Sequence, residues 1–244
     1  MNTDVLRREN VLRLGKFDAA VNALEKCVSI NPGQPQVYKL MGRIYVIREA
    51  HAGAERAFMK AMQLNPGDSE AVYLLGRLYQ SIGRLDEAAR AFEKALELAP
   101  NLVRAQAYLG TVYFGLGRDA EAAEVLERSV AANSDTSKPD FVPHLEYGIY
   151  LQRMDRLEKS VAQLQRAAKL GSSNLEAWLE LGRTLYRLNR LDEASRALRK
   201  AAELDSKDSR PHYLLARICY ERGDSGCGDR HAERAEWNRD GEPQ

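Results

Sequence analysis

The apolar positions of this chain recur with the spacing of a helix, and the whole pattern then recurs along the sequence. Between Ser69 and Leu102 the recurring residues are Leu75, Gly76, Tyr79, Ala88, Phe92, Ala95 and Pro100. Apolar residues four positions apart lie on one face of a helix, so the pattern predicts two amphipathic helices. Gly83 and Pro100 are residue types that end helices. The stretch therefore predicts a hairpin of two helices.

The same pattern occurs 34 residues earlier and 34 residues later. The earlier copy consists of Met41, Gly42, Tyr45, Ala54, Phe58, Ala61 and Pro66. The later copy retains Leu109, Gly110, Tyr113, Ala122 and Leu126. A fixed period indicates an array in which each hairpin buries its apolar face against the next. The order L-G-x-x-Y, then Ala, then x-x-x-F, then Pro resembles the tetratricopeptide repeat, a helix-turn-helix unit. The resemblance implies an all-α, right-handed superhelical solenoid.

The period divides the chain into seven repeats, or about fourteen helices. The expected boundaries are about 1–34, 35–68, 69–102, 103–136, 141–174, 175–208 and 209–242. Residues 137–140 are an insertion, because Gly110 and Gly148 are 38 residues apart rather than 34. We therefore expect one solenoid domain over residues 1–244, with a longer loop after the fourth repeat.

The two end repeats depart from the pattern. In repeat one, Arg7 and Arg8 stand where Leu and Gly are expected, and the second helix should follow a turn at Gly15. Cys27 occupies a small position of that repeat, which predicts a buried side chain. In repeat seven the second helix, expected over residues 229–238, is mostly charged. The ends fit polar caps of a solenoid, and the first also fits the edge of a longer array.

Composition narrows the class of protein. The 244 residues are 29% charged, with a net charge of +1, which gives no global attraction to nucleic acid or to a membrane surface. No apolar run approaches the length of a membrane span, and the first residues lack the apolar segment of a signal peptide. We therefore expect a cytoplasmic protein, unless the chain is part of a longer one whose compartment differs.

The usual catalytic patterns are absent from the sequence. We find no phosphate-binding glycine loop, no nucleophile elbow and no metalloprotease-type histidine pair. The expectation is therefore a non-enzymatic protein-interaction scaffold without a cofactor. Two alternatives stay open: a recruiting or regulatory module of a larger enzyme or of a secretion or assembly complex, and a structural array that self-associates through its ends.

One group of metal-ligand residue types falls in repeat seven: His212, Cys219, Cys227 and His231. The first two are seven apart on one expected helix, and the last two are four apart on the next, so they could converge on zinc. Their spacing matches no short metal-finger pattern. The alternative assigns His212 to the aromatic fourth position of the repeat and Cys219 to its buried eleventh. We therefore predict no metal and keep the cluster as the second interpretation.

The resemblance also implies where a partner binds. In such arrays the first helices line an inner groove with their second, fifth, sixth and ninth positions. In repeats two to four these positions include Lys39, Arg43, Tyr73, Arg77, Arg104 and Tyr108. Later repeats contribute Glu146, Glu180 and Arg183. Tyrosine and arginine are the residue types that anchor interfaces, which predicts binding of a peptide or helix with an acidic segment.

Two observations restrict that prediction. The sixth positions Leu40, Leu74 and Tyr108 lack the asparagines with which chaperone-binding members hold a peptide terminus. Binding of a chaperone tail is therefore not expected. The charged positions also fit plain solvated helix faces, on which each arginine lies beside a neighbouring glutamate.

Overall fold

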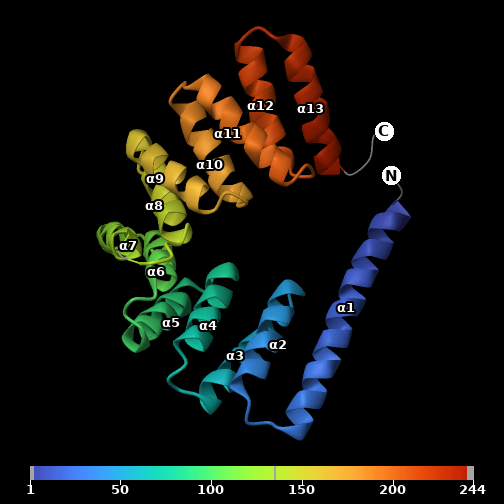
Figure 1. Ribbon diagram of the computed structural model, residues 1–244, viewed down its shortest axis with the longest axis vertical. Helices are drawn as coiled ribbons and strands as arrows, with labels where there is room; N and C mark the ends of the chain where they lie inside the picture. The colour runs from blue at the N-terminus through green and yellow to red at the C-terminus, as the bar shows by residue number, and fades with distance from the viewer. Residues whose placement is uncertain (1–2, 135, 241–244) are drawn as a thin grey trace. The chain divides into compact units, whose positions relative to one another are not determined.

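The computed structural model describes residues 3–134 and 136–240, with the side chains of 17–134 and 136–236. Thirteen α-helices and no strand occur in this part of the chain (Figure 1). They are α1 (Thr3–Ile30), α2 (Pro35–Ile47), α3 (His51–Leu64), α4 (Ser69–Ser81), α5 (Leu85–Leu98), α6 (Val103–Gly115), α7 (Asp119–Ser134), α8 (Val142–Arg153), α9 (Leu157–Leu170), α10 (Leu175–Arg187), α11 (Leu191–Leu204), α12 (Ser209–Glu221) and α13 (Ser225–Asp240). The all-α repeat solenoid that the period predicts is confirmed.

The helices belong to two compact units, residues 1–122 and 123–244. In the first unit α2 packs on α3 and α4 on α5, and in the second α8 packs on α9, α10 on α11 and α12 on α13 (Figure 1). Within each unit the first helix of a repeat also contacts the first helix of the next, as α2 does with α4 and α10 with α12. The second helices α3 and α5, or α9 and α11, make no such contact in the described residues. First helices therefore form one shared layer in each unit.

The hairpins depend on a close approach between a glycine and a large residue of the facing helix. A Cβ atom added at Gly76 would lie 2.9 Å from Cδ1 of Phe92, which is fully buried. A Cβ at Gly182 would lie 2.6 Å from Cγ of Leu198, which is also fully buried. Both distances are shorter than carbon atoms in contact allow. The first helix can approach the second this closely only because the position has no side chain.

Local signals set the helix ends. The Asp68 carboxylate caps α4, because its Oδ1 accepts hydrogen bonds of 3.1 Å from the backbone N–H groups of both Glu70 and Ala71. The turn between α4 and α5 places Gly83 at φ 77°, a left-handed conformation that costs glycine nothing. Asn189 takes the corresponding place between α10 and α11 at φ 57°, which asparagine tolerates better than most residues.

Helix α1 differs from the sequence-based expectation. It runs without interruption from Thr3 to Ile30 and passes through Gly15, where we expected a turn. A single glycine inside a helix costs only about 1 kcal/mol relative to alanine, and no proline follows it to stop the helix. The described chain therefore contains one long helix followed by twelve shorter helices rather than fourteen helices in seven pairs. The side chains of Arg7 and Arg8 lie outside the described residues.

The prediction that Cys27 is buried is wrong, because the side chain is exposed. With α1 continuous, repeat one has no second helix to cover this face. Val21 is 6% exposed, but Ile30 at the end of the same helix is 85% exposed. The apolar residues in the described part of α1 are therefore only partly covered by the rest of the unit.

The insertion forms part of the loop between α7 and α8. Asn133 is fully buried, its Nδ2 donates to the backbone oxygen of Asp140 at 2.7 Å, and the Asp140 N–H donates to its Oδ1 at 2.8 Å. One side chain thus closes the longer loop. None of the described helices combines the length and the apolar character that crossing a membrane requires.

Candidate functional site

The first unit carries the basic and aromatic residues of repeats two to four, but two of its cations are already paired. Lys39 is 5% exposed, and its Nζ lies 2.8 Å from Asp68 Oδ2 and 2.6 Å from Glu70 Oε2. Arg43 Nη2 lies 2.6 Å from Glu70 Oε1. Burial opposes the charge on Lys39, but hydrogen bonds and attraction from Asp68 and Glu70 outweigh it and raise its pKa. These two cations are therefore compensated within the protein.

Arg77 on α4 contacts aromatic side chains instead of a carboxylate. Its Cζ lies 3.9 Å from the ring centroid of Tyr108 on α6, and its Nη1 donates to the hydroxyl of Tyr73 at 3.4 Å. The side chain is exposed, and no carboxylate of the described residues forms an ion pair with it. The rings of Tyr73 and Tyr108 lie 6.2 Å apart, and the buried Phe92 packs 6.1 and 6.2 Å from them. We call Tyr73, Arg77 and Tyr108 the Arg77 cluster.

Arg104 lies exposed on α6, the helix that carries Tyr108, and makes an interaction of its own. Of the six positions that the pattern singles out in this unit, the structure brings three together in the Arg77 cluster and places Lys39 and Arg43 in a separate ion-pair network. Both the Arg77 cluster and the ion-pair network depend on contacts between side chains of neighbouring repeats.

In the second unit the expected acidic positions are not an open acidic surface. Glu180 is 4% exposed, and its Oε1 lies 2.8 Å from Arg183 Nη1. Burial raises the pKa of the Glu180 carboxyl, while Arg183 acts in the opposite direction. Glu146 is partly buried on α8 and has an interaction partner. Glu180 and Arg183 therefore form a buried-to-surface ion pair within α10.

The second unit also contains a cleft of about 510 Å³. It is lined mainly by α12 and α13, with Arg183 from α10 at one side. Tyr213 and Tyr220 contribute aromatic rings that are 57% and 46% exposed. Arg217 places its Cζ 5.1 Å from the ring centroid of Tyr186. Tyr213 and Arg217 stand at the fifth and ninth positions of repeat seven, which the repeat pattern assigns to the groove, whereas the pattern does not assign Tyr220 to it.

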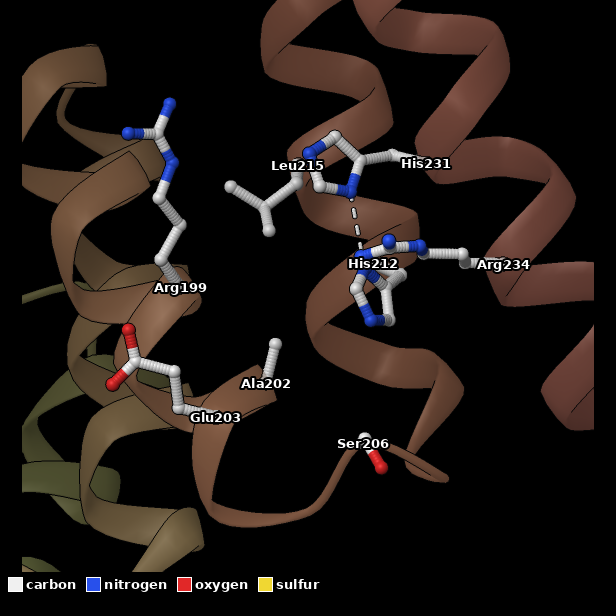
Figure 2. A pocket seen from close by; sticks show the side chains of 8 residues that line it. All are labelled: Arg199, Ala202, Glu203, Ser206, His212, Leu215, His231 and Arg234. Atoms are coloured by element: carbon white, nitrogen blue, oxygen red, sulfur yellow. Dashed lines mark hydrogen bonds between the residues drawn. The ribbon is translucent and has the colours of Figure 1, made fainter.

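The metal-ligand residue types of repeat seven come together between α12 and α13. Cys219 and Cys227 form a disulfide, and Nδ1 of His212 lies 3.0 Å from Nδ1 of His231 (Figure 2). Burial lowers the pKa of His212, and the positive charge of the nearby Arg234 lowers it further. Burial also lowers the pKa of His231, as does the neighbouring His212. Both rings are therefore neutral near pH 7, and one Nδ1–H donates to the other Nδ1.

Figure 2 shows this histidine pair on the wall of a pocket of about 680 Å³. Arg199 and Glu203 reach it from α11, and Arg234 from α13. The disulfide could not be derived from the sequence, because the two cysteines are eight positions apart on different helices and only the turn between α12 and α13 brings them together.

Family models described as tetratricopeptide repeat match residues 12–34, 45–91, 73–136 and 151–218. The chain belongs to the tetratricopeptide repeat family. This assignment agrees with the helix pairs of both units and with the glycine contacts between their helices. No curated protein shows significant sequence similarity to the chain.

Several solved tetratricopeptide-type structures share the fold. The Cut9–Hcn1 hetero-tetramer of the APC/C matches 93% of this chain and 44% of its own chain, with a TM-score of 0.77 and 21% identity. The type IV pilus biogenesis factor PilW matches 84% of this chain and 93% of its own, with a TM-score of 0.70 and 19% identity. PilF of Pseudomonas aeruginosa matches 92% and 93%, with a TM-score of 0.68 and 18% identity. At such identities the likeness shows the fold alone.

This chain therefore spans less than half of the matched Cut9–Hcn1 chain and nearly all of the two pilus proteins. Tetratricopeptide repeats typically serve as non-catalytic modules of protein interaction. A protein-binding array is thus the general function that the family supports, and the surface that binds is a separate question.

Proposed function

We propose that this tetratricopeptide array binds a segment of a partner protein on the layer of first helices in the first unit, with the Arg77 cluster as the main contact. One observation carries the proposal. The Arg77 guanidinium lies exposed on the ring of Tyr108, and no carboxylate of the described chain pairs with it. A partner segment with an acidic residue would supply that missing charge.

The geometry suits recognition of a carboxylate. Stacking on Tyr108 uses the face of the guanidinium, so most of its N–H groups stay at the edge, where a carboxylate accepts two parallel hydrogen bonds. Tyr73 and Tyr108 rest on the buried Phe92, so their positions are set before a partner arrives. Side chains that are already ordered lose less entropy on binding, which favours affinity.

The surroundings add apolar contact without adding competing charge. Leu40 on α2 is 48% exposed, and α2 packs beside α4. Lys39 and Arg43 are neutralised by Asp68 and Glu70 and do not compete with Arg77 for an acidic ligand. The expected ligand is therefore a peptide or helix with apolar side chains and one acidic side chain placed for Arg77.

The test is a paired capture experiment from the source lysate with wild type, Arg77→Glu and a matched control. Arg90→Glu is the control, because Arg90 is exposed on α5, the second helix of the same repeat, and undergoes the same change of charge. All three chains should be equally helical by circular dichroism. We expect a partner to be lost with Arg77→Glu alone, and its isolated segment to bind Arg77→Glu at least about 30-fold more weakly, as at a hot spot. Equal recovery with all three chains would reject the site.

Self-association is a second candidate function, favoured by the exposed rings of Tyr213 and Tyr220 on the last helix pair. If it occurs there, light scattering should show a dimer that Tyr213→Glu converts to a monomer. A wild-type chain that stays monomeric at high concentration excludes it. A role as a recruiting module of a larger assembly, and the cytoplasmic location, stay predictions.

A further inference from the structure

The described part of the last helix, α13, lies outside the hydrophobic core cluster of the second unit. That cluster takes its buried apolar residues from α8 to α12. The contacts between α12 and α13 include the Cys219–Cys227 disulfide, the contact of His212 with His231, and a hydrogen bond of 2.8 Å from the Tyr220 hydroxyl to Asp229 Oδ1, and the Tyr220 ring packs on Gly228. A cross-link at this place therefore has a structural purpose.

Three of these residues, Cys219, Cys227 and His231, are of types that bind metals and lie close enough together to share one ion. The Sγ atoms of Cys219 and Cys227 and one ring nitrogen of His231 all lie within 4.8 Å of one another. Ligand atoms that share one zinc ion at about 2.0–2.3 Å come to lie roughly 3–4 Å apart, so rotation of side chains is enough to form the site. Thiolate and imidazole are also the ligands that zinc prefers in proteins.

His212 contributes by holding His231. Its Nδ1 lies 3.0 Å from Nδ1 of His231, with the two rings facing each other from opposite helices (Figure 2). Because this contact uses Nδ1 of His231, the nitrogen left for a metal is Nε2. A ligating histidine whose other nitrogen is bonded in this way is fixed in tautomer and orientation, which strengthens metal binding.

We propose that, when Cys219 and Cys227 are thiols, these two residues and His231 bind one zinc ion, which links α12 to α13 in place of the disulfide. His212 acts as a positioning residue, and water takes the fourth position. Compartments that are reducing keep cysteine pairs as thiols, so the cross-link would be a zinc site there and a disulfide in an oxidising compartment.

The chemistry balances. A phosphine reductant breaks the S–S bond by giving two electrons; each sulfur takes up a proton, and the phosphine becomes its oxide with oxygen from water. Zinc binding then releases both thiol protons, because the thiolate is the ligand. Two thiolates, Zn²⁺ and a neutral histidine sum to no net charge, so Arg199 and Arg234 at the neighbouring pocket do not oppose the site.

The experiment measures metal binding by the full chain after reduction with the phosphine. Zinc content after desalting should be one equivalent, and Co²⁺ should give the absorption of a thiolate-to-cobalt charge transfer. Cys227→Ser and His231→Ala should bind neither metal, whereas Cys27→Ser should behave as wild type, because Cys27 is the exposed free cysteine of α1. The oxidised wild type, which needs no mutation, should bind none.

Two further measurements separate the roles. His212→Ala should weaken zinc binding by about 10- to 100-fold while the cobalt charge-transfer band is retained, as expected of a positioning residue. Zinc should also slow amide exchange in α13 of the reduced chain, and a chelator should reverse this. The proposal is wrong if the reduced wild type retains no zinc, or if Cys227→Ser retains as much zinc as wild type.

Discussion

Replacing Gly42 by alanine should destabilise repeat two, although alanine is the better helix former. A Cβ atom at Gly42 would lie 2.4 Å from Cε1 and 2.6 Å from Cδ1 of Phe58. Carbon atoms in contact are about 3.5–4.0 Å apart, so the ring would have to move by roughly 1 Å. Phe58 is only 1% exposed, which leaves it no open space to move into.

The magnitude follows from two opposing terms. Overpacking of a filled core costs about 1–3 kcal/mol. The helix propensity gained on replacing glycine by alanine offsets about 1 kcal/mol. Since the clash is severe and Phe58 is enclosed, we expect the overpacking term near its upper end and a net loss of about 1–2 kcal/mol.

Gly53→Ala in the facing helix α3 is the matched control. Its Cβ would lie 3.2 Å from Cγ of Tyr45, whose ring is partly exposed and can yield. The helix propensity should then dominate, and the variant should be unchanged or more stable by up to about 1 kcal/mol. The same substitution is thus expected to have opposite signs at two positions of one hairpin.

Amide hydrogen exchange of peptides from α2 and α3 is the assay, because it reports local opening without assuming two-state unfolding of the whole array. Gly42→Ala should exchange about 5- to 30-fold faster than wild type, the factor that corresponds to 1–2 kcal/mol. Gly53→Ala should exchange no faster than wild type. Protection in Gly42→Ala equal to or greater than that of wild type would show that Phe58 repacks freely, and would refute the reasoning.

Three further predictions concern buried polar groups. Burial raises the pKa of Glu180, so the ionised carboxylate destabilises the fold above that pKa. This penalty disappears as the pH falls towards about 4.3, the pKa of a glutamate in the unfolded chain. Glu180→Gln should therefore raise the melting temperature at pH 8 and lose this advantage near pH 4.5. Thr184→Val removes the hydroxyl that accepts a hydrogen bond of 2.7 Å from the Gln152 side-chain amide. The loss should lower the free energy of unfolding in urea by about 1–3 kcal/mol, and an unchanged midpoint would mean that the amide finds another partner. Asp68→Asn keeps an N-cap but removes the charge beside Lys39. Burial opposes ionisation of Asp68, but the contact with Lys39 and the backbone hydrogen bonds outweigh it and lower the pKa of Asp68. The stability difference from wild type should therefore be full above about pH 4 and shrink at lower pH, and a difference that does not change with pH would contradict the ion pair.

The repeat architecture could be predicted because its determinants are local and periodic. Glycine at the crossing, a large residue on the facing helix and a turn residue between them specify each hairpin, and the 34-residue period says that the hairpins stack. The same reasoning failed at α1, where Gly15 and the small position of Cys27 fit the pattern without the packing partner that gives the pattern meaning. A helix face is buried only if another helix covers it.

For the candidate binding surfaces, the sequence predicts where residues lie but not whether they are free to bind a partner. The resemblance to the tetratricopeptide repeat was enough to assign Tyr73, Arg77 and Tyr108 to first helices, and they lie on α4 and α6. Only the tertiary structure decided that Lys39 is neutralised by Asp68, that Glu180 is buried and that Arg77 has no carboxylate partner among the described residues. The physical reason is distance: ion pairing and desolvation act over a few ångströms, between side chains of helices that are far apart in the chain. The sequence thus determines which residues lie on the layer of first helices. The packing of neighbouring repeats determines which of those residues remain available to a partner.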